Sequence, residues 1–568
     1  MPATNDATAC DSRISSWSVR VIPSVDCTIQ SFAVNWSPTS LGEKLVPMGS
    51  IGLEEKTRDY LTHGDPDEFN PELWSSGRLP DRQPETHLNV LIVGAGPSGL
   101  MTALECWRKG HNVVGILERS KGPVYTGDLV IIAPSAITVF KHWPDMLEDL
   151  EADKRESSQY YYKHTGEHIL GPTRFTFNEP DVEAEIRRAG NPVPGPNQIR
   201  KQFFRTLLKQ VARIGLRVEY DTTVAEYFEV EAAGVAGVVL SGSRAVRVAD
   251  LVVAADATRT RSDLLIHGRH QPAKSSGMSV YRCSMPPEIP LQDPAFRERW
   301  GEAIERGESS HEFWLGRGMH LNMAISPKIV AFGLTPRDST QMEGGVAPIE
   351  SWQPDVDPEQ VLEVLRRTPG WPAAVESLIK SAPKGSVVHW PLMWRNLQES
   401  WTSQGGLVVQ VGDAAHSTIP ASASGATLAL EDAVTLASCL QLSCINGGKQ
   451  GASLGARVYN MLRYQRVACS QKAAFVNSEI LARANMEEIS KNPEKAKIHY
   501  PKWLFMHDPE KYAYDNYGSA VANLLSGAPF QNTNIPPGHK FSVWTMEGVL
   551  EEYRSGKKAA DFLDGDWS

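Results

Sequence analysis

The stretch LNVLIVGAGPSGL, residues 88–100, decides the fold of this chain. An apolar strand runs into a glycine-rich turn, and a helix-forming segment follows as far as Lys109. In such a turn Gly94 permits the tight bend, Gly96 lets the backbone approach a pyrophosphate, and Gly99 lets the helix pack on the strand. The free N–H groups at the start of the helix then face an anion, so the stretch predicts a dinucleotide-binding site.

The residues beyond the turn complete a strand–helix–strand unit. A second strand, VVGIL at residues 113–117, ends in Glu118. This is the spacing at which an acidic side chain accepts hydrogen bonds from the hydroxyls of an adenosine ribose. A glycine pattern alone is a weak signal, so the prediction depends on the full order of strand, turn, helix, strand and acid. A purely structural unit without a ligand is the alternative.

Two later segments have the same character. DLVVAADA, at residues 250–257, places Asp256 at a strand end, where α/β folds put ligand contacts. GLVVQVGDAAH, at residues 406–416, runs a buried strand into a polar turn that holds Asp413, and a helix is expected from Gly425. The start of that helix carries partial positive charge and suits an anionic reduced heterocycle.

Composition limits the possible partners. The chain has 568 residues, 41% hydrophobic and 22% charged, as in globular proteins, and its net charge of −10 argues against nucleic acid as a partner. The seven cysteines have no C-x-x-C spacing, which argues against a disulfide framework and a zinc site, and no metal-ligand cluster stands out. We find no secretory signal and no apolar run long enough to span a bilayer, so a cytoplasmic protein is expected.

The three blocks resemble, in order and separation, the single-component FAD-dependent monooxygenases of the aromatic-hydroxylase type, especially the salicylate-hydroxylase-like branch common in fungal secondary metabolism. The resemblance extends from about His87 into the 510s. It implies an α/β fold with a Rossmann-like FAD-binding domain of the GR2/PHBH type, an antiparallel-sheet substrate layer and a helical C-terminal region.

Five segments are expected on this basis. They are an irregular N-terminal extension (1–86), an FAD-binding βαβ part (87–276), a substrate-side sheet layer (277–395), a second FAD-binding segment (396–445), and a helical C-terminal region with a tail (446–568). The purpose of the extension is not legible, and the sequence leaves a homodimer open.

The resemblance also implies which residues bind FAD. Glu118 and the first glycine turn would hold the ADP half, Asp256 would lie near the pyrophosphate and the reductant path, and Asp413 would bind the ribityl chain. Backbone donors around Gly425 are candidates for the negative charge near the flavin N1. The full expected set is Gly94, Gly96, Gly99, Glu118, Arg200, Asp256, Gly412, Asp413, Gly425 and Ala426. From its sequence position alone, Arg200 could equally be a solvated arginine.

The sequence departs from the family pattern at two turns. Ala254-Ala255-Asp256-Ala257 stands where the family has Gly-Ala-Asp-Gly, which puts a methyl group where the backbone would approach the cofactor or the nicotinamide. Ala423-Ser424-Gly425 stands where the family often has Gly-Gln-Gly, so the turn beside the flavin ring is expected to be stiffer or differently shaped.

The implied reaction is hydride transfer from NAD(P)H to FAD, formation of a flavin C4a-hydroperoxide with dioxygen, and transfer of one oxygen atom to a small aromatic or polyketide-type metabolite. We expect hydroxylation or dearomatising hydroxylation, while epoxidation and Baeyer–Villiger insertion remain open. Related enzymes that act on phenolates carry an arginine in a similar Tyr-Arg pair, so Arg282 and Tyr281 are the catalytic candidates, although a structural salt bridge would explain Arg282 equally well. His416 is expected to be a packing residue rather than a base.

Two other classes of function remain. One is a flavin-dependent oxidase or dehydrogenase that inserts no oxygen. The other is a non-catalytic flavin-binding partner protein, suggested by the altered alanine motif and the unexplained extension.

Overall fold

The computed structural model describes residues 69–567, apart from 75, 124–128, 155, 338–352, 421–422, 483–485, 499 and 558. Most of the expected N-terminal extension, residues 1–68, therefore lies outside the described residues, as do Cys10 and Cys27. The other five cysteines are buried free thiols.

A five-stranded parallel sheet forms around the glycine-rich stretch. Its order is β18 (Val408–Gln410), β11 (Leu251–Ala254), β1 (Asn89–Val93), β2 (Asn112–Leu117) and β7 (Val218–Glu219). The register pairs Ile92 of β1 with Val253 on one side and with Ile116 on the other. Both β1 and β11 are buried almost throughout, as expected for central strands of a sheet covered on both faces.

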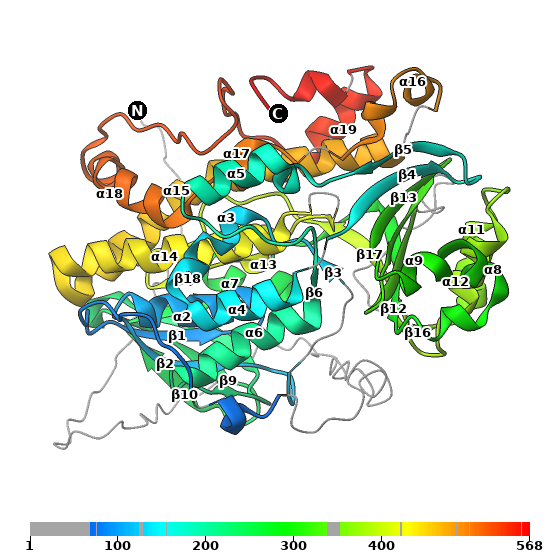
Figure 1. The fold of residues 1–568 in the computed structure, drawn as a ribbon. Coiled ribbons are helices and arrows are strands. Elements are labelled where there is room, and N and C mark those ends of the chain that lie inside the picture. The colour runs from blue at the N-terminus through cyan, green and yellow to red at the C-terminus, as the bar shows by residue number, and fades with distance from the viewer. Residues whose placement is uncertain are drawn as a thin grey trace, which may run out of the picture. The chain divides into compact units, whose positions relative to one another are not determined.

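Long helices cover this sheet. Helix α2 (Pro97–Arg108) follows β1 directly and packs against α6 (Arg200–Arg213), which also contacts α4 (Pro144–Asp153). Helix α14 (Gly425–Gly447) packs against α2, α15 (Ala452–Ala482) and α18 (Pro509–Ser526). Figure 1 shows α14 running between the parallel sheet and the C-terminal helices. The core of this part is one apolar cluster that includes strand β1 and helices α2, α6 and α14.

A second sheet of eight strands forms the layer expected on the substrate side (Figure 1). Its order is β16 (Gln353–Val356), β17 (Val387–Trp394), β12 (Lys274–Met285), β15 (Val330–Pro336), β14 (Met319–Ile325), β13 (Ser310–Gly316), β4 (Ser158–Lys163) and β5 (His168–Thr173). All neighbours are antiparallel except β13 and β4, which are parallel.

The strands β4 and β5 come from a part of the chain where sequence analysis expected only the nucleotide-binding unit. On one face of the sheet lie α8 (Pro294–Phe296), α9 (Glu302–Glu305), α11 (Pro358–Leu365) and α12 (Ala373–Lys380), and their apolar residues join those of the strands in a second core. The opposite face of the sheet is therefore left to contribute to a site.

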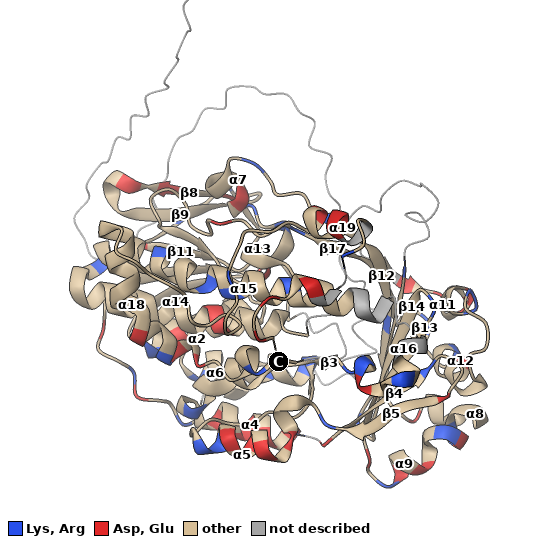
Figure 2. Ribbon diagram, turned by 90° about the horizontal axis from the view of Figure 1, so that it is seen from above, with Lys and Arg blue, Asp and Glu red and all other residues tan. Residues whose placement is uncertain are grey.

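Shorter elements connect these layers. A three-stranded antiparallel sheet is formed by β10 (Val246–Ala249), β9 (Val235–Leu240) and β8 (Val224–Val230), and β3 (Leu129–Val130) pairs with β6 (Gln198–Ile199). The remaining helices are α3 (Pro134–Ile137), α5 (Pro180–Arg188), α7 (Ser262–His267), α13 (Asp413–His416), α16 (Met486–Lys491), α17 (Lys502–Phe505) and α19 (Met546–Arg554). Acidic side chains line the outer helices α4 and α5, shown in red in Figure 2.

The helical run Gly425–Ser478 is long and apolar enough, by length and composition, to cross a membrane. The run differs from the expectation that no apolar run of this chain is long enough to span a bilayer. However, 89% of its most apolar window is buried inside the protein, so packing in the core explains its apolar character.

A buried charge network holds α14 and α15 together. Glu431 of α14 accepts hydrogen bonds from Arg463 at 2.6 Å and from Arg466 at 2.9 Å, and none of these side chains is more than 1% exposed. Arg466 also donates to the backbone carbonyls of Trp503 and Leu504, which ties the C-terminal segment to the same carboxylate. The two arginines hold the pKa of Glu431 well below its usual range despite the burial that opposes them.

We predict that Glu431→Gln lowers the free energy of unfolding by about 3 to 5 kcal/mol, because it leaves two buried guanidinium groups with one fewer charged partner. Urea unfolding followed by circular dichroism measures this change. The control is Glu308→Gln, an exposed partner of Arg306, which should change stability by less than about 0.5 kcal/mol. Equal effects of the two substitutions would contradict the assigned role of the network.

Candidate active site

The strand-to-helix junctions predicted from sequence meet at one edge of the parallel sheet. Neighbouring strands β1, β11 and β18 all run in the same direction, so their carboxyl ends lie together. A Cβ on Gly94 would lie 2.2 Å from the carbonyl oxygen of Ala255, and one on Gly412 would lie 2.9 Å from Oγ of Ser98. Residues more than 300 positions apart in sequence thus form one site.

The first glycine turn has the geometry of an anion cradle. Gly94 has φ +107°, in the region that favours glycine, and a Cβ on Gly99 would lie 1.9 Å from the carbonyl oxygen of Gly94. A Cβ on Gly96, by contrast, would have no neighbour within 4 Å, and Gly96 precedes α2 without a side-chain cap. The amides at the start of α2 therefore face open space, which fits a pyrophosphate.

Glu118 is fixed by backbone donors at the end of β2. Its carboxylate accepts hydrogen bonds from the Ala95 and Ser120 N–H groups, both at 2.9 Å. The bond to Ala95 ties the end of β2 to the glycine turn. A carboxylate has about four acceptor positions, so Glu118 retains capacity for the hydroxyls of a ribose.

Asp413 and Arg200, two residues of the expected FAD-binding set, lie near enough to each other to interact electrostatically. Asp413 begins α13 directly after Gly412, and its side chain is accessible from the open site although protein surrounds that site. The surrounding protein raises the pKa of the Asp413 carboxyl by desolvation, while electrostatic interactions with His416, Arg395 and Arg200 oppose this rise. Arg200, at the start of α6, thus acts electrostatically on a residue 213 positions away in the numbering of the chain.

Two residues that sequence analysis did not select hold the Gly412–Asp413 turn. Asp432 of α14 accepts from the Gly412 N–H at 2.9 Å and contacts Nε2 of His416 at 2.5 Å, and Arg395 donates to the Asp413 carbonyl at 2.7 Å. His416 is 2% exposed, which agrees with the expected hydrogen-bonded packing residue. Neither Asp432 nor Arg395 carries a motif signal, because only the folded chain brings it to the turn.

Asp256 is held from the neighbouring three-stranded sheet. Its Oδ2 accepts a hydrogen bond from the hydroxyl of Tyr227 at 2.7 Å. Burial raises the pKa of Asp256, and the bonds from Thr260 and Tyr227 oppose that rise. The structure therefore gives Asp256 a role in anchoring β8 to the edge of the cofactor site.

Both departures from the family pattern fall on strained backbone. Ala257 has φ +66° and Ala423 has φ +49°, so each alanine occupies the left-handed region where the family has glycine. The carbonyl of Ala423 accepts a hydrogen bond from the Tyr500 hydroxyl at 3.0 Å, which helps to fix its turn. The chain retains the backbone conformation that suits glycine and bears the steric cost of a methyl group.

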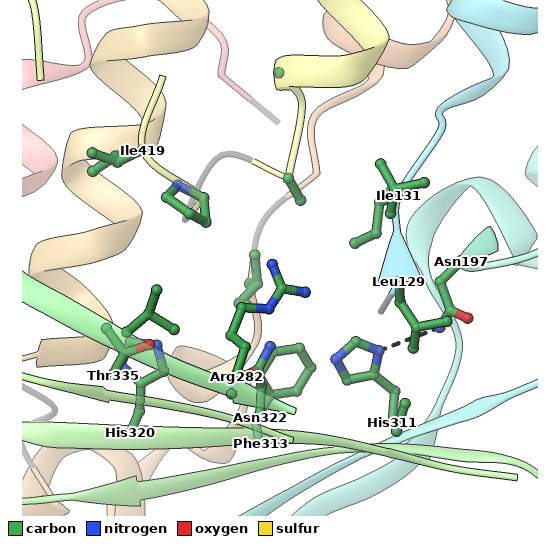
Figure 3. A pocket seen from close by; sticks show the side chains of 18 of the residues that line it. Leu129, Ile131, Asn197, Arg282, His311, Phe313, His320, Asn322, Thr335 and Ile419 are labelled. Carbon is green, nitrogen blue, oxygen red and sulfur yellow. Dashed lines mark hydrogen bonds between the residues drawn. The ribbon is translucent and has the colours of Figure 1, made fainter. Parts of the chain in front are cut away.

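A cavity of about 290 Å³ lies between the open face of the eight-stranded sheet and the start of α14 (Figure 3). Ser424, Gly425 and Ala426 line it on the α14 side. The first N–H groups of a helix have no partner within the helix, so this end of α14 can stabilise negative charge next to the cavity. Much of the remaining wall is apolar, with Leu129, Ile131, Phe313, Ile419 and Leu392 among the lining residues.

Only one of the two catalytic candidates lies in this cavity. Arg282 lines it, and Figure 3 shows its guanidinium directed into the space above the sheet. Tyr281 does not line it, because successive side chains of a strand point to opposite faces. Tyr281 instead lies against His389, with ring centroids 4.3 Å apart and ring planes tilted by 31°, and packs against the second core. The expectation that Tyr281 acts beside Arg282 in the pocket is therefore corrected, because Tyr281 lies on the opposite face of the sheet.

Several other polar residues of the cavity were not predicted from the sequence. His311 of β13 lies 3.4 Å from the Asn197 amide, and His320, Asn322 and Thr335 line the cavity from β14 and β15. Of these residues, His320 and Asn322 alternate with apolar residues along β14. That alternation is the signal that could have found them, once strands were paired into a sheet.

Comparisons with known proteins agree with this arrangement. Residues 87–456 match the model of the family described as FAD binding domain. The chain is 61% identical over 514 residues to the FAD-dependent monooxygenase AacuC of Aspergillus aculeatus, which covers 90% of this chain and 99% of the relative.

Two solved structures share the fold. CtdE in complex with FAD and substrate 4 has a TM-score of 0.67 at 24% identity, covering 77% of this chain and 100% of CtdE. A salicylate hydroxylase substrate complex has a TM-score of 0.56 at 18% identity, covering 77% and 97%.

The chain therefore belongs to the FAD binding domain family, and its cradle and paired junctions fit that cofactor. It is an FAD-dependent monooxygenase, and the resemblance to the aromatic-hydroxylase type is confirmed.

We predict that Gly96→Ala and Gly99→Ala separate cofactor binding from folding. Gly96→Ala should leave the unfolding midpoint of the FAD-free protein unchanged and weaken FAD binding by about tenfold or more, since its methyl would occupy the cradle. Gly99→Ala should also destabilise the FAD-free protein by about 1 to 3 kcal/mol, because its Cβ meets backbone. Flavin fluorescence titration and thermal unfolding measure the two effects. Unaltered FAD affinity in Gly96→Ala would remove Gly96 from the cradle.

We also predict that Ala257→Gly stabilises the protein, by up to about 1 kcal/mol, because glycine adopts the left-handed conformation without steric cost. Ala233→Gly is the matched control, since Ala233 is exposed and lies in a short helix. That control should be neutral or destabilising. A loss of stability in Ala257→Gly would show that φ at residue 257 is not left-handed in solution.

Proposed function

We propose that the enzyme uses NAD(P)H and dioxygen to insert one oxygen atom into a small aromatic or polyketide-type metabolite, by hydroxylation or dearomatising hydroxylation. The observation that carries this proposal is the position of Arg282 in a largely apolar cavity beside the start of α14. The resemblance to the secondary-metabolism branch supports a role in the biosynthesis of such a metabolite.

The contacts above support the following placement of FAD. The N–H groups of the Gly96–Gly99 turn would hold the pyrophosphate, Glu118 the ribose hydroxyls, and Asp413 with Arg200 the middle of the molecule. The start of α14 at Gly425 and Ala426 would face the flavin ring and stabilise negative charge on it. FAD, reduced by NAD(P)H, supplies the activation of dioxygen.

Arg282 would bind the substrate oxygen in its anionic form. A guanidinium stays charged and favours an ionised hydroxyl next to it, and an ionised phenol is the more electron-rich reactant for an electrophilic oxygen. Arg282 also lies over the Trp390 ring, with Cζ 5.9 Å from the centroid, which restricts its side chain. The apolar wall of the cavity keeps water away from the reacting atoms.

An oxygen-isotope experiment tests the reaction class. Labelled dioxygen should place one labelled atom in the product for each NAD(P)H consumed. A desaturated product without label would instead support a flavin-dependent oxidase or dehydrogenase, and a flavin that NAD(P)H cannot reduce would support a non-catalytic partner. The homodimer and the cytoplasmic location stay predictions.

We predict that Arg282→Met lowers kcat/KM for a phenolic substrate by about 100-fold, and that the lost rate returns partly at higher pH. Without the guanidinium the pKa of the bound hydroxyl rises, so ionisation requires a higher pH. The pH profile of kcat/KM measures this shift. Arg306→Met, an exposed change at a residue that does not line the cavity, is the control. An unchanged profile in Arg282→Met would exclude Arg282 from substrate ionisation.

A further inference from the structure

His320 is a polar residue of the cavity that the reaction described above does not use. It lies on β14, between buried residues Met319 and Leu321, and its side chain lines the cavity on the same sheet as Arg282 (Figure 3). Its Nδ1 atom is buried and has no hydrogen-bond partner within the described part of the chain. That nitrogen is closed to solvent, so a ligand in the cavity would meet the accessible part of the His320 imidazole rather than Nδ1.

The imidazole of His320 is neutral. Desolvation lowers its pKa to about 4, and no charged neighbour contributes to the shift. A neutral imidazole has one N–H donor and one acceptor nitrogen, so it can pair with a hydroxyl or with a carbonyl but does not neutralise an anion. Its chemistry therefore differs from that of Arg282 in the same cavity.

The sheet register places His320 away from Arg282. Gly333 of β15 pairs with Arg282 on one side and with Asn322 on the other. Two strand spacings put the backbones of Arg282 and Asn322 about 10 Å apart, and His320 lies two residues, or about 7 Å, further along β14. A Cβ on Gly333 would lie 2.3 Å from Oδ1 of Asn322, so the glycine makes room for that amide.

His320 has a second polar neighbour on the next strand. Thr335 pairs directly with His320, and both line the cavity. His320, Asn322 and Thr335 together form a neutral hydrogen-bonding group on β14 and β15, which we call the β14–β15 polar group. Arg282 forms a separate, cationic group.

We propose that the β14–β15 polar group, with His320 at its centre, binds a second oxygen of the substrate, so that the enzyme selects fused aromatic compounds carrying one hydroxyl at Arg282 and another hydroxyl or carbonyl remote from it. This proposal rests on the proposed function, because it assigns the hydroxyl at Arg282 to the reacting ring. His320 is a specificity-determining residue here and takes no part in oxygen transfer.

The selectivity follows from the cost of an unpaired group. A site built to hydrogen-bond a substrate hydroxyl discriminates strongly against an analogue that lacks it, because the buried polar atoms of the site are then left without a partner. A cavity walled by apolar side chains alone would separate the two compounds only weakly. The β14–β15 polar group should therefore act at the level of binding, before any chemistry.

The test compares a naphthol with the dihydroxynaphthalene that carries its second hydroxyl on the far ring. Binding is followed by the change in flavin fluorescence of the oxidised holoenzyme, without NAD(P)H. The second hydroxyl should tighten binding to the unaltered enzyme by about tenfold or more. In His320→Phe this gain should fall to about twofold or less, and His320→Gln, which keeps a donor and an acceptor, should retain most of it.

His389→Phe is the matched control, since His389 packs on Tyr281 and does not line the cavity. It should keep the full gain. Equal binding of the two compounds to the unaltered enzyme would overturn the proposal without any variant, and so would an undiminished gain in His320→Phe. Failure of the proposed function is seen separately, as an absence of labelled oxygen in every phenolic product while the binding difference persists.

Discussion

Three glycines without side chains allow the strand-to-helix junctions of this protein to meet. At Gly94, Gly99 and Gly412 a Cβ would lie between 1.9 and 2.9 Å from a neighbouring atom. The ends of β1, β11 and β18 can approach so closely only because these three residues have no Cβ. That approach aligns the start of α2 with the Gly412–Asp413 turn, and it leaves Gly96 facing open space for a cofactor.

Buried charges then hold what the glycines allow. Asp432 links the Gly412 amide to His416 and Arg463. The preceding residue, Glu431, binds Arg463 and Arg466, and through these arginines it also holds the C-terminal segment. Such buried ion pairs add little net stability compared with apolar packing. They fix the geometry, because a buried charge that loses its partner costs free energy. The second sheet completes the site by presenting Arg282 to the start of α14.

The sequence predicted the parts of the site that depend on local backbone chemistry. A few consecutive residues were enough to predict a role for the glycine turn, for Glu118 and for the Gly412–Asp413 turn. It did not predict that β4 and β5 join the second sheet or that Arg395 and Asp432 hold the turn, because those contacts arise from distant pairing. The prediction that Tyr281 lies in the pocket with Arg282 was wrong for a simpler reason, because adjacent residues of a strand point to opposite faces of the sheet. Three family glycines are replaced by alanine, and the left-handed conformations of two of them, Ala257 and Ala423, explain the family preference at those positions.

A crystal structure of the holoenzyme would show whether the two strand-to-helix junctions bind one FAD. We expect pyrophosphate oxygens within hydrogen-bond distance of the backbone N–H groups of Gly96, Ser98 or Gly99, and the flavin ring next to Gly425 at the edge of the cavity that holds Arg282. A flavin bound elsewhere, or a pyrophosphate without contact to the Gly96–Gly99 turn, would contradict this expectation.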